Sequence, residues 1–254
     1  MHDLVPVDEA AVRRSPSVVA LEDDTPRVSE LFAFMAEAEL RFESLRMRIV
    51  DRTWTARGEQ EETVEVAIRH PGAARIVRRR DGGGLSRDYD IWVTDGRIIT
   101  AFDARSNTAS VRPVRDRVVG ATDPGLPSFA RVWVPRTPLP PDSLAEAFVH
   151  PRGLCRNVLS TGPVSWIGTR TMATGREALL LRVDHPRTSH LLTDRPDRWV
   201  EVGVDRMTGV VLGLEEHIGD RTTRQAEVVD LELDPELPDG TFTVHLSSDV
   251  HMLY

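Results

Sequence analysis

Apolar side chains recur with two different periods along this chain, and each period predicts its own kind of element. Between residues 28 and 42 they recur three or four positions apart, which is the spacing of one face of an α-helix. Thr25 suits the N-cap of such a helix, and Pro26 suits its first position, where a missing N–H costs nothing. The pattern therefore predicts one amphipathic helix that ends near residue 42 and needs a partner for its apolar face.

From Ser44 the apolar period changes to two, which is typical of half-buried antiparallel strands. Residues 45–50 and 64–69 both alternate in this way, and "HPGAARIVRRR" adds a turn and a third strand. The stretch "DYDIWVTDGRIITAFDARSNTASVRPV" at 88–114 holds three more apolar runs separated by two polar turns. Asp-Gly between apolar runs is a strong hairpin signal, because a type I′ turn needs positive φ at both central residues. This half of the chain is predicted to form a β-meander.

The last third of the chain shows the same two-residue period. We expect three runs to lie side by side: "REALLLRVDH", "WVEVGVDRMTGVVLGLEEH" with a hairpin loop at 205–209, and "TTRQAEVVDLEL". A last short strand is predicted at "TFTVHL", after a turn at 238–240. The sheet should therefore contain about ten strands.

Residues 115–161 differ from the strand-forming parts on both sides. Prolines cluster at 124–141, and Ser143 with Glu146 forms the signature of a capping box at the start of a helix. A second helical stretch is expected from Leu154 to Leu159. This helical insertion is a candidate lid over the sheet.

Length, composition and charge limit the possible classes of protein. A chain of 254 residues that is 40% hydrophobic can bury a core as one domain, which we expect over 26–254, after a loosely ordered extension at 1–25. The net charge of -8 disfavours nucleic acid and anionic membranes as partners. No stretch approaches the ~20 apolar residues that span a bilayer. The first residues lack the basic start and apolar run of a signal peptide, which favours a cytoplasmic location.

Three stretches of the sequence carry a resemblance to a known family. "VTDGRIITAFDARSNTASV" resembles a strand, Asp-Gly turn, strand pattern of the LolA/RseB-like family, which contains periplasmic lipoprotein carriers and a sensor of lipoprotein stress. "GREALLLRVDHP" is similar to another strand of that family, and "WVEVGVDRMTGVVLGLEEHIGD" with "VVDLELDPELPDGTF" resembles its closing hairpin. The likeness runs from about residue 28 to residue 244.

The resemblance implies a fold, a location and a site. The fold would be α+β, with a strongly curved antiparallel sheet, an incomplete barrel, whose concave face is covered by the N-terminal helix and the central helical insertion. Its cavity would hold acyl chains, and an extracytoplasmic location is the alternative to the cytoplasm. Arg75 stands where carriers have an Arg-Trp pair near the cavity mouth, with Ile76 in place of the Trp.

Candidate reactive groups were weighed against ordinary structural roles. The sets are His185 and His190 with Asp184, Ser160 with His150 and Asp142, the adjacent carboxylates Glu215–Glu216 and Asp23–Asp24, and the lone Cys155. The histidine pair lacks further ligands at a regular spacing, and the serine lacks a Gly-x-Ser-x-Gly elbow. Adjacent carboxylates on a strand point to opposite faces, and "RRRDGGG" lacks the Lys-Ser/Thr ending of a P-loop. The sequence therefore predicts no catalytic residue, no metal site and no cofactor, and favours a protein that is not an enzyme.

An apolar concave face could bind a ligand without any charged anchor. At about 0.8 kcal/mol per buried methylene, an acyl chain of some 14 to 16 methylenes offers roughly 10 kcal/mol of gross driving force. The side chains expected to contact such a ligand are Met47, Ile49, Val66, Ile68, Arg75, Ile91, Val93 and Leu181 from the sheet, and Phe129, Trp133, Leu144 and Phe148 from the insertion.

Two functions are therefore predicted. The first is non-catalytic binding of a hydrophobic small molecule, an acyl chain or a lipidated partner in the concave face. The alternative is a regulatory module that binds a protein partner, resembling the sensor branch of the family, in which the cavity is filled by the protein's own side chains.

Overall fold

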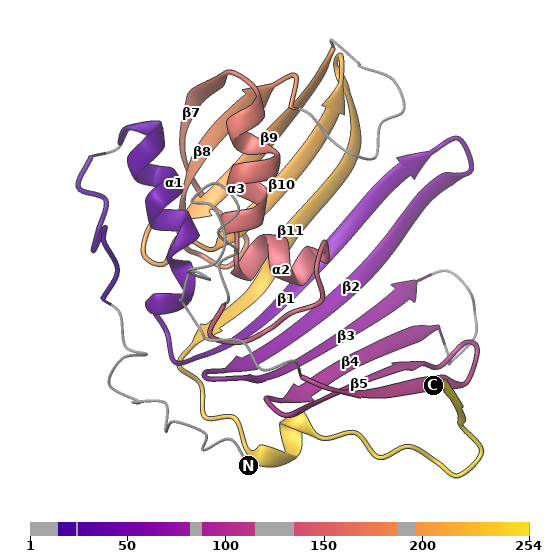
Figure 1. Cartoon of the computed structure of the whole chain (residues 1–254). Coiled ribbons are helices and arrows are strands. Elements are labelled where there is room, and N and C mark those ends of the chain that lie inside the picture. The colour runs from indigo at the N-terminus through magenta and orange to yellow at the C-terminus, as the bar shows by residue number, and fades with distance from the viewer. Residues whose placement is uncertain (1–14, 24, 82–87, 115–134, 187–196, 254) are drawn as a thin grey trace, which may run out of the picture.

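A single twelve-stranded sheet with three short α-helices on its concave side makes up the computed structural model, which describes residues 15–23, 25–81, 88–114, 135–186 and 197–253 (Figure 1). The strands are β1 (Ser44–Thr55), β2 (Gly58–Arg69), β3 (Ala73–Asp81), β4 (Tyr89–Asp95), β5 (Ile98–Asp103), β6 (Thr108–Pro113), β7 (Val164–Thr171), β8 (Glu177–Asp184), β9 (Arg198–Asp205), β10 (Val211–Ile218), β11 (Arg221–Leu233) and β12 (His251–Leu253). The helices are α1 (Val28–Ala36), α2 (Leu144–Val149) and α3 (Arg152–Asn157), with 3-10 turns η2 (Ala38–Leu40), η4 (Leu159–Thr161) and η5 (Asp239–Phe242).

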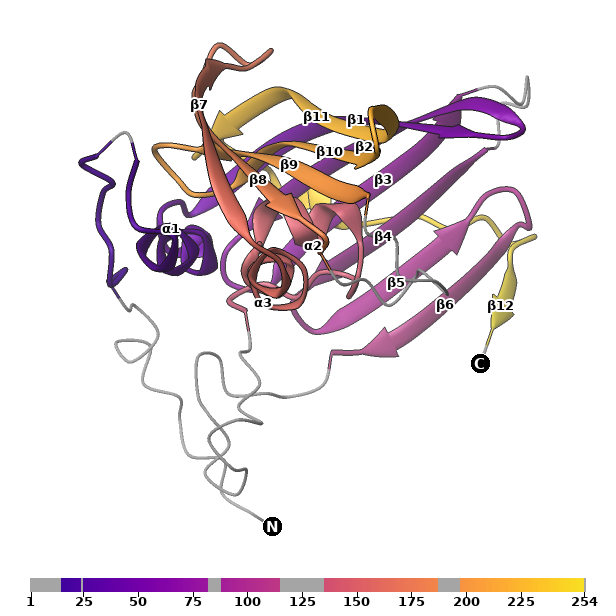
Figure 2. The ribbon, with the colours of Figure 1, turned by 90° about the horizontal axis from the view of Figure 1, so that it is seen from above.

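The order across the sheet is β12-β6-β5-β4-β3-β2-β1-β11-β10-β9-β8-β7. Neighbours are antiparallel except β12, which pairs with β6 in parallel. The predicted meander is confirmed as β4-β5-β6, and the three later runs lie side by side as β8 to β11. Figure 2 shows the sheet curving around α2 and α3 without closing into a barrel. The predicted fold class, a curved sheet covered by helices, is thus confirmed.

The first helix is shorter than its periodicity predicts. It begins at Val28 with Arg27 as N-cap, whose φ of -60° and ψ of 138° are extended, so Pro26 lies outside the helix and Thr25 is too far back to cap it. It ends at Ala36 because Glu37 leaves the helical region, and the apolar spacing continues through η2 instead. At the second predicted cap, Ser143 Oγ accepts the Glu146 N–H at 3.1 Å, as expected.

The predicted strand "TFTVHL" is wrong. Its first residues belong to η5, and the segment crosses the convex face of the sheet with Leu237 and Phe242 buried beneath it. Carbonyl groups here accept hydrogen bonds from side chains and not from a strand ladder: Arg69 donates to Leu237 O at 2.9 Å and Arg75 to Thr243 O at 3.0 Å. The last strand is β12, further along the chain.

Strand register assigns each side chain to one face. Met47 lies opposite Val66, Val66 opposite Ile76, and Ile76 opposite Trp92, so this row shares the concave face. The next row, which includes Val93, points to the convex face. No helix within the described residues is long and apolar enough to cross a membrane.

Candidate functional site

The concave face beneath the helices is packed with side chains from both layers. The largest of them keep 0 or 1% of their surface exposed: Leu31, Phe34, Met35, Leu45, Met47, Ile49, Ile68, Phe148, Leu159, Leu179, Leu181 and Leu212. A side chain that lined a void wide enough for water would keep accessible surface on that side. The helices therefore fill the space that an acyl chain would need over this part of the sheet.

Six of the expected ligand-contacting side chains lie together in this core. They are Met47, Ile49, Val66, Ile68, Phe148 and Leu181, and Leu144 packs partly buried against them. The structure thus brings these residues to one place, but in contact with each other and with the helices. Phe129 and Trp133 lie outside the described residues.

Three expected site residues lie on the opposite face. Arg75 pairs with Val93, and Ile91 sits two residues before Val93 on the same strand, so all three point to the convex side. Trp92 lies on the concave face and packs, partly buried, against the core. Both faces of β4 carry apolar side chains, so alternation along "YDIWVTD" does not reveal which set points inward. The expectation that Arg75, Ile91 and Val93 share a cavity with Met47 is wrong on this register.

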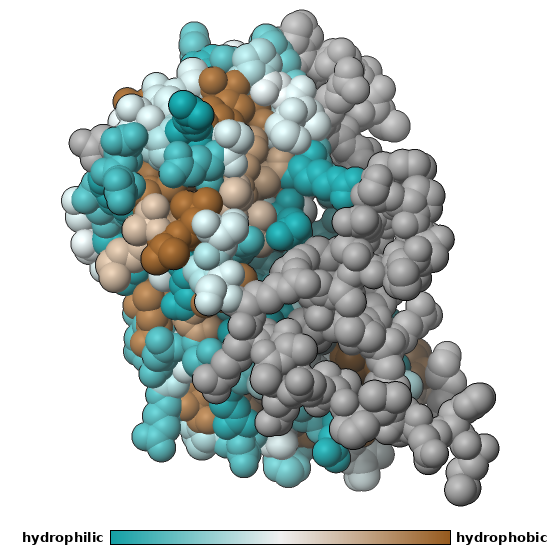
Figure 3. Space-filling view, turned by 60° about the vertical axis from the view of Figure 1, so that its left-hand side comes forward, coloured by the Kyte–Doolittle hydropathy of each residue, from teal (hydrophilic) through white to brown (hydrophobic). Residues whose placement is uncertain are grey.

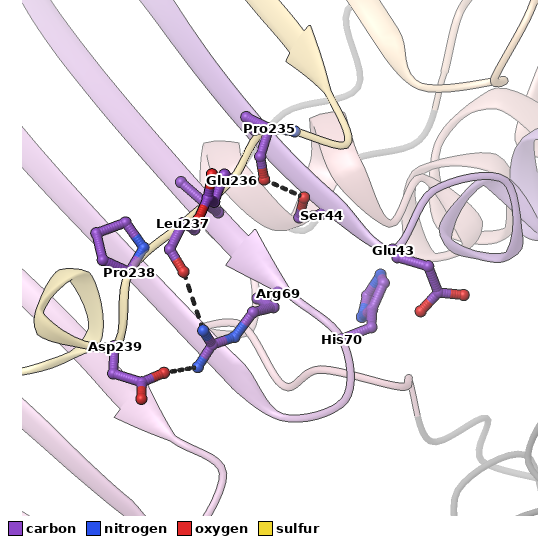
Figure 4. A pocket seen from close by; sticks show the side chains of 9 residues that line it. All are labelled: Glu43, Ser44, Arg69, His70, Pro235, Glu236, Leu237, Pro238 and Asp239. Carbon is purple, nitrogen blue, oxygen red and sulfur yellow. Dashed lines mark hydrogen bonds and ion pairs between the residues drawn. The ribbon is translucent and has the colours of Figure 1, made fainter.

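An open hollow of about 510 Å³ lies where the end of β2 meets the segment after β11. Figure 4 shows Arg69 reaching toward Leu237 and Asp239, with Glu43 and His70 at the other end of the hollow. Arg69 Nη2 donates to Asp239 Oδ1 at 2.7 Å, so the guanidinium forms an ion pair with an exposed carboxylate. The hollow is shallow and lined by charged as well as apolar residues, unlike a site for an acyl chain.

Behind this hollow lies a buried polar cluster of Glu39, His70 and His150. Glu39 belongs to η2, His70 follows β2 directly, and His150 caps the C-terminal end of α2. One ligand atom from each of the three lies within 4.8 Å of the other two.

Figure 3 shows the outer surface on the helical side, where apolar and polar side chains are mixed over α1 and its neighbours.

Burial controls the protonation of both histidines. Burial, with smaller contributions from the neighbouring His150 and Arg136, lowers the pKa of His70 from 6.5 to about 2. Burial also lowers the pKa of His150, against the opposing effect of Glu39. Both rings are therefore neutral at physiological pH.

The spacing of these residues gave no signal of the cluster. The sequence indicates His150 only as a possible partner of Ser160 and Asp142, and the structure does not support that set. Ser160 Oγ donates to Arg156 O at 2.8 Å on the exposed side of its helix, and Asp142 is exposed. Glu39, His70 and His150 come from η2, the turn after β2 and the end of α2, which are far apart in the sequence. Their spacing along the chain therefore follows no motif.

The other weighed groups have structural partners. Asp184 Oδ1 accepts from Arg182 at 2.8 Å, and His190 lies outside the described residues. Glu215 lies next to His217, whereas Glu216 faces Arg198 and Arg224, so the two carboxylates point apart as expected. Of the pair at 23–24, Asp23 is exposed and Asp24 lies outside the described residues.

Cys155 is a buried thiol on α3, with its Sγ 3.7 Å from Met35 Sδ. Burial raises its pKa from 9.0 to about 12, so the thiolate is scarce at pH 8. We expect native protein at pH 8 to react with a disulfide reagent only as fast as it unfolds, and denatured protein to react at once. Fast labelling of the folded chain would contradict this burial.

The thiol of Cys155 also makes stability depend on pH. In the unfolded chain it ionises at a lower pH than in the folded chain, so it lowers the free energy of unfolding as the pH rises above about 9.

No protein-family model and no curated relative matches the sequence. Several solved structures are similar to this chain over most of its length. A structure of the Pseudomonas aeruginosa MucA/MucB complex matches with 17% identity and a TM-score of 0.48, covering 87% of this chain and 62% of that one. A LolA superfamily protein from Nitrosomonas europaea matches with 10% identity and a TM-score of 0.32, over 87% of this chain and 99% of that one.

An uncharacterized conserved protein from Thermus thermophilus also matches, with 9% identity and a TM-score of 0.47, over 89% of this chain and 99% of that one. This chain spans 62% of the length of the MucB chain that it matches. Likenesses at this level concern the fold and carry no information about what this chain binds.

Proposed function

We propose that this chain is a non-catalytic binding protein whose core is filled by its own side chains and whose surface engages a protein partner. The observation that carries this proposal is the burial of the concave face beneath α1, α2 and α3, where the large side chains keep 0 or 1% of their surface. Sites for small molecules typically enclose about 300–1,000 Å³. Opening such a space here would expose side chains such as Phe148 to water, at roughly 1.5–3 kcal/mol each.

An apolar patch at one end of the sheet supports a protein partner. Ile98, Val111 and Met252 are 46%, 49% and 40% exposed. Val111 lies opposite Thr100, which is two residues after Ile98 on β5. Met252 lies opposite Ala109, which is two residues before Val111 on β6. The three exposed side chains therefore point to the same, convex face. We name these three residues the outer apolar patch. Contiguous exposed apolar side chains on one face are typical of interaction surfaces.

The neighbouring strand edge offers main-chain groups to such a partner. Among the described residues, β12 covers β6 only from Thr108 to Ser110, and Val111–Pro113 continue beyond it. A strand of a partner could extend the sheet there, with the outer apolar patch supplying contacts for its side chains.

Native mass spectrometry of protein purified without detergent tests the filled core. We expect the chain at its own mass of 28.4 kDa with no acyl lipid bound. Co-purifying lipid in a stoichiometric amount would contradict the filled core. Val66→Glu is not a useful probe of ligand uptake, because Val66 is 1% exposed and a buried carboxylate there would unfold the chain.

A pair of surface variants tests the partner. Val111→Glu should abolish capture of a partner that wild-type protein retains in a cross-linking pull-down. Ile167→Glu, at a 47% exposed position on β7 at the opposite edge, should retain it. Equal loss in both variants, or in neither, would contradict docking at the outer apolar patch.

A hydrophobic ligand remains the second candidate because one part of the concave face is not fully covered. Trp92, Ala101, Ser110 and Leu253 form one row across β4, β5, β6 and β12 on that face. Leu253 is 56% exposed and Trp92 is half-buried. If lipid does co-purify, Leu253→Glu should reduce its amount, whereas Val111→Glu on the other face should not.

A further inference from the structure

We propose that Glu39, His70 and His150 form a binding site for a divalent transition-metal ion, with Zn²⁺ as the ion best suited to it. This inference is independent of the proposed protein partner. Two imidazoles and a carboxylate are a donor set that zinc uses in proteins, and three protein ligands leave a fourth position open. The three residues come from η2, the turn after β2 and the end of α2, so an ion would join the helical cover to the sheet.

The three donors already lie close together. One ligand atom of each lies within 4.8 Å of the others, and His150 Nε2 is 3.6 Å from Glu39 Oε2. Ligands of a tetrahedral zinc ion with bonds of about 2.0–2.1 Å are about 3.4 Å apart. Binding would therefore draw the donors together by roughly 1 Å, which small side-chain rotations supply.

Unpartnered buried nitrogens point to a ligand at this place. Among the described residues neither His70 Nε2 nor His150 Nε2, both buried, has a hydrogen-bond partner, and the His150 side chain is 8% exposed. Buried polar atoms in native proteins are almost always paired, so such atoms need an explanation. A metal ion satisfies two imidazole nitrogens and one carboxylate at the same time.

The groups around the cluster hold its donors in orientation. His70 Nδ1 is 2.7 Å from Thr137 Oγ1, which also accepts the Gly72 N–H at 2.9 Å. When Nδ1–H donates to Thr137, the lone pair of the neutral ring lies on Nε2, as in metal-binding histidines. Glu39 Oε2 accepts the Arg136 N–H at 2.8 Å, which fixes the carboxylate.

The charge balance allows a cation. The Arg136 guanidinium lies near the cluster, but its Nη2 donates to Glu43 Oε2 at 2.8 Å, so a second carboxylate offsets its charge. Glu39 supplies a carboxylate charge at the cluster itself, where it also interacts with the Arg152 guanidinium. His70 belongs both to the cluster and to the lining of the open hollow, so the cluster borders the hollow at this residue (Figure 4).

Metal titration of the full chain tests the site. After dialysis against a chelator, wild-type protein should bind one Zn²⁺ or Co²⁺ per chain, measured by calorimetry and by elemental analysis of the protein. His70→Gln and His150→Gln should each raise the Kd at least about 100-fold, and Thr137→Val, which only positions His70, should raise it about 10–100-fold.

His217→Gln is the matched control. His217 is also a buried histidine whose Nε2 lacks a hydrogen-bond partner in the part of the chain that the structure describes. A carboxylate oxygen, Glu215 Oε2, lies 3.4 Å from this Nε2, but His217 lies on β10 outside the cluster. This variant should bind the ion as wild-type protein does.

X-ray absorption of Zn²⁺-loaded wild-type protein keeps the proposal testable if the histidine variants do not fold. We expect two imidazole ligands and an oxygen ligand around the ion. Three results would overturn the proposal: wild-type protein that binds no ion, folded His70→Gln or His150→Gln protein that keeps wild-type affinity, or a bound ion with fewer than two imidazole ligands.

Discussion

Asp205→Ala is expected to lower the free energy of unfolding by about 3–5 kcal/mol, the cost of leaving one member of a buried ion pair without its partner. Asp205 is 1% exposed at the end of β9. Its carboxylate accepts two hydrogen bonds from Arg176, at 2.9 and 2.8 Å, and one from the Thr208 N–H at 2.9 Å. The substitution would strand the guanidinium and release the loop that leads into β10.

Glu177→Ala is the control for this prediction, since Glu177 pairs with Arg206 at the same end of the sheet at 3.0 Å but is 51% exposed. An exposed pair contributes at most about 1 kcal/mol, so this variant should stay close to wild-type stability. Urea unfolding of the three proteins measures the difference. Similar midpoints for Asp205→Ala and wild-type protein would show that the carboxylate does not hold the loop.

Phe148→Ala is expected to cost about 3–5 kcal/mol, because it removes a large side chain from a core that has little room to collapse. Phe148 is 0% exposed and comes from α2, between the helices and the sheet. A filled core also predicts that the new void takes up a small apolar probe such as benzene or xenon, which wild-type protein should not bind.

Ile167→Ala provides the comparison, since Ile167 is 47% exposed on β7 and its truncation should change stability by no more than about 0.5 kcal/mol. Thermal unfolding with and without the probe measures both effects. A loss below about 1 kcal/mol for Phe148→Ala, or probe binding by wild-type protein, would mean that the concave face holds space of its own.

The strands could be predicted because their signal is local. The alternation in 45–50 and 64–69 requires only that one face of a sheet be buried. The hairpin before β5 forms as predicted, but only Gly96 has positive φ, at 92°, whereas Asp95 stays in β4, so the turn is not the type I′ turn that Asp-Gly predicts. The predicted helix ends near residue 42, whereas α1 ends at Ala36. The helical spacing of apolar residues continues through η2, which is a 3-10 turn and not part of the α-helix.

The candidate site could not be predicted in the same way. Ile91 and Val93 alternate correctly, but alternation does not say which face the helices cover, and that is decided by the pairing of Ile76 with Trp92. The cluster of Glu39, His70 and His150 depends on how η2, the turn after β2 and α2 pack together. Neither fact is present in any short stretch of the chain.

The pairing of β1 with β11 has a consequence for synthesis of the chain. β1 lies in the middle of the sheet with β2 on one side, and that hairpin can form as soon as both strands have left the ribosome. Its other edge pairs with Arg224–Leu233, which is translated much later. Until then the growing chain carries an open, apolar strand edge, so the nascent protein depends on protection from aggregation for most of its translation.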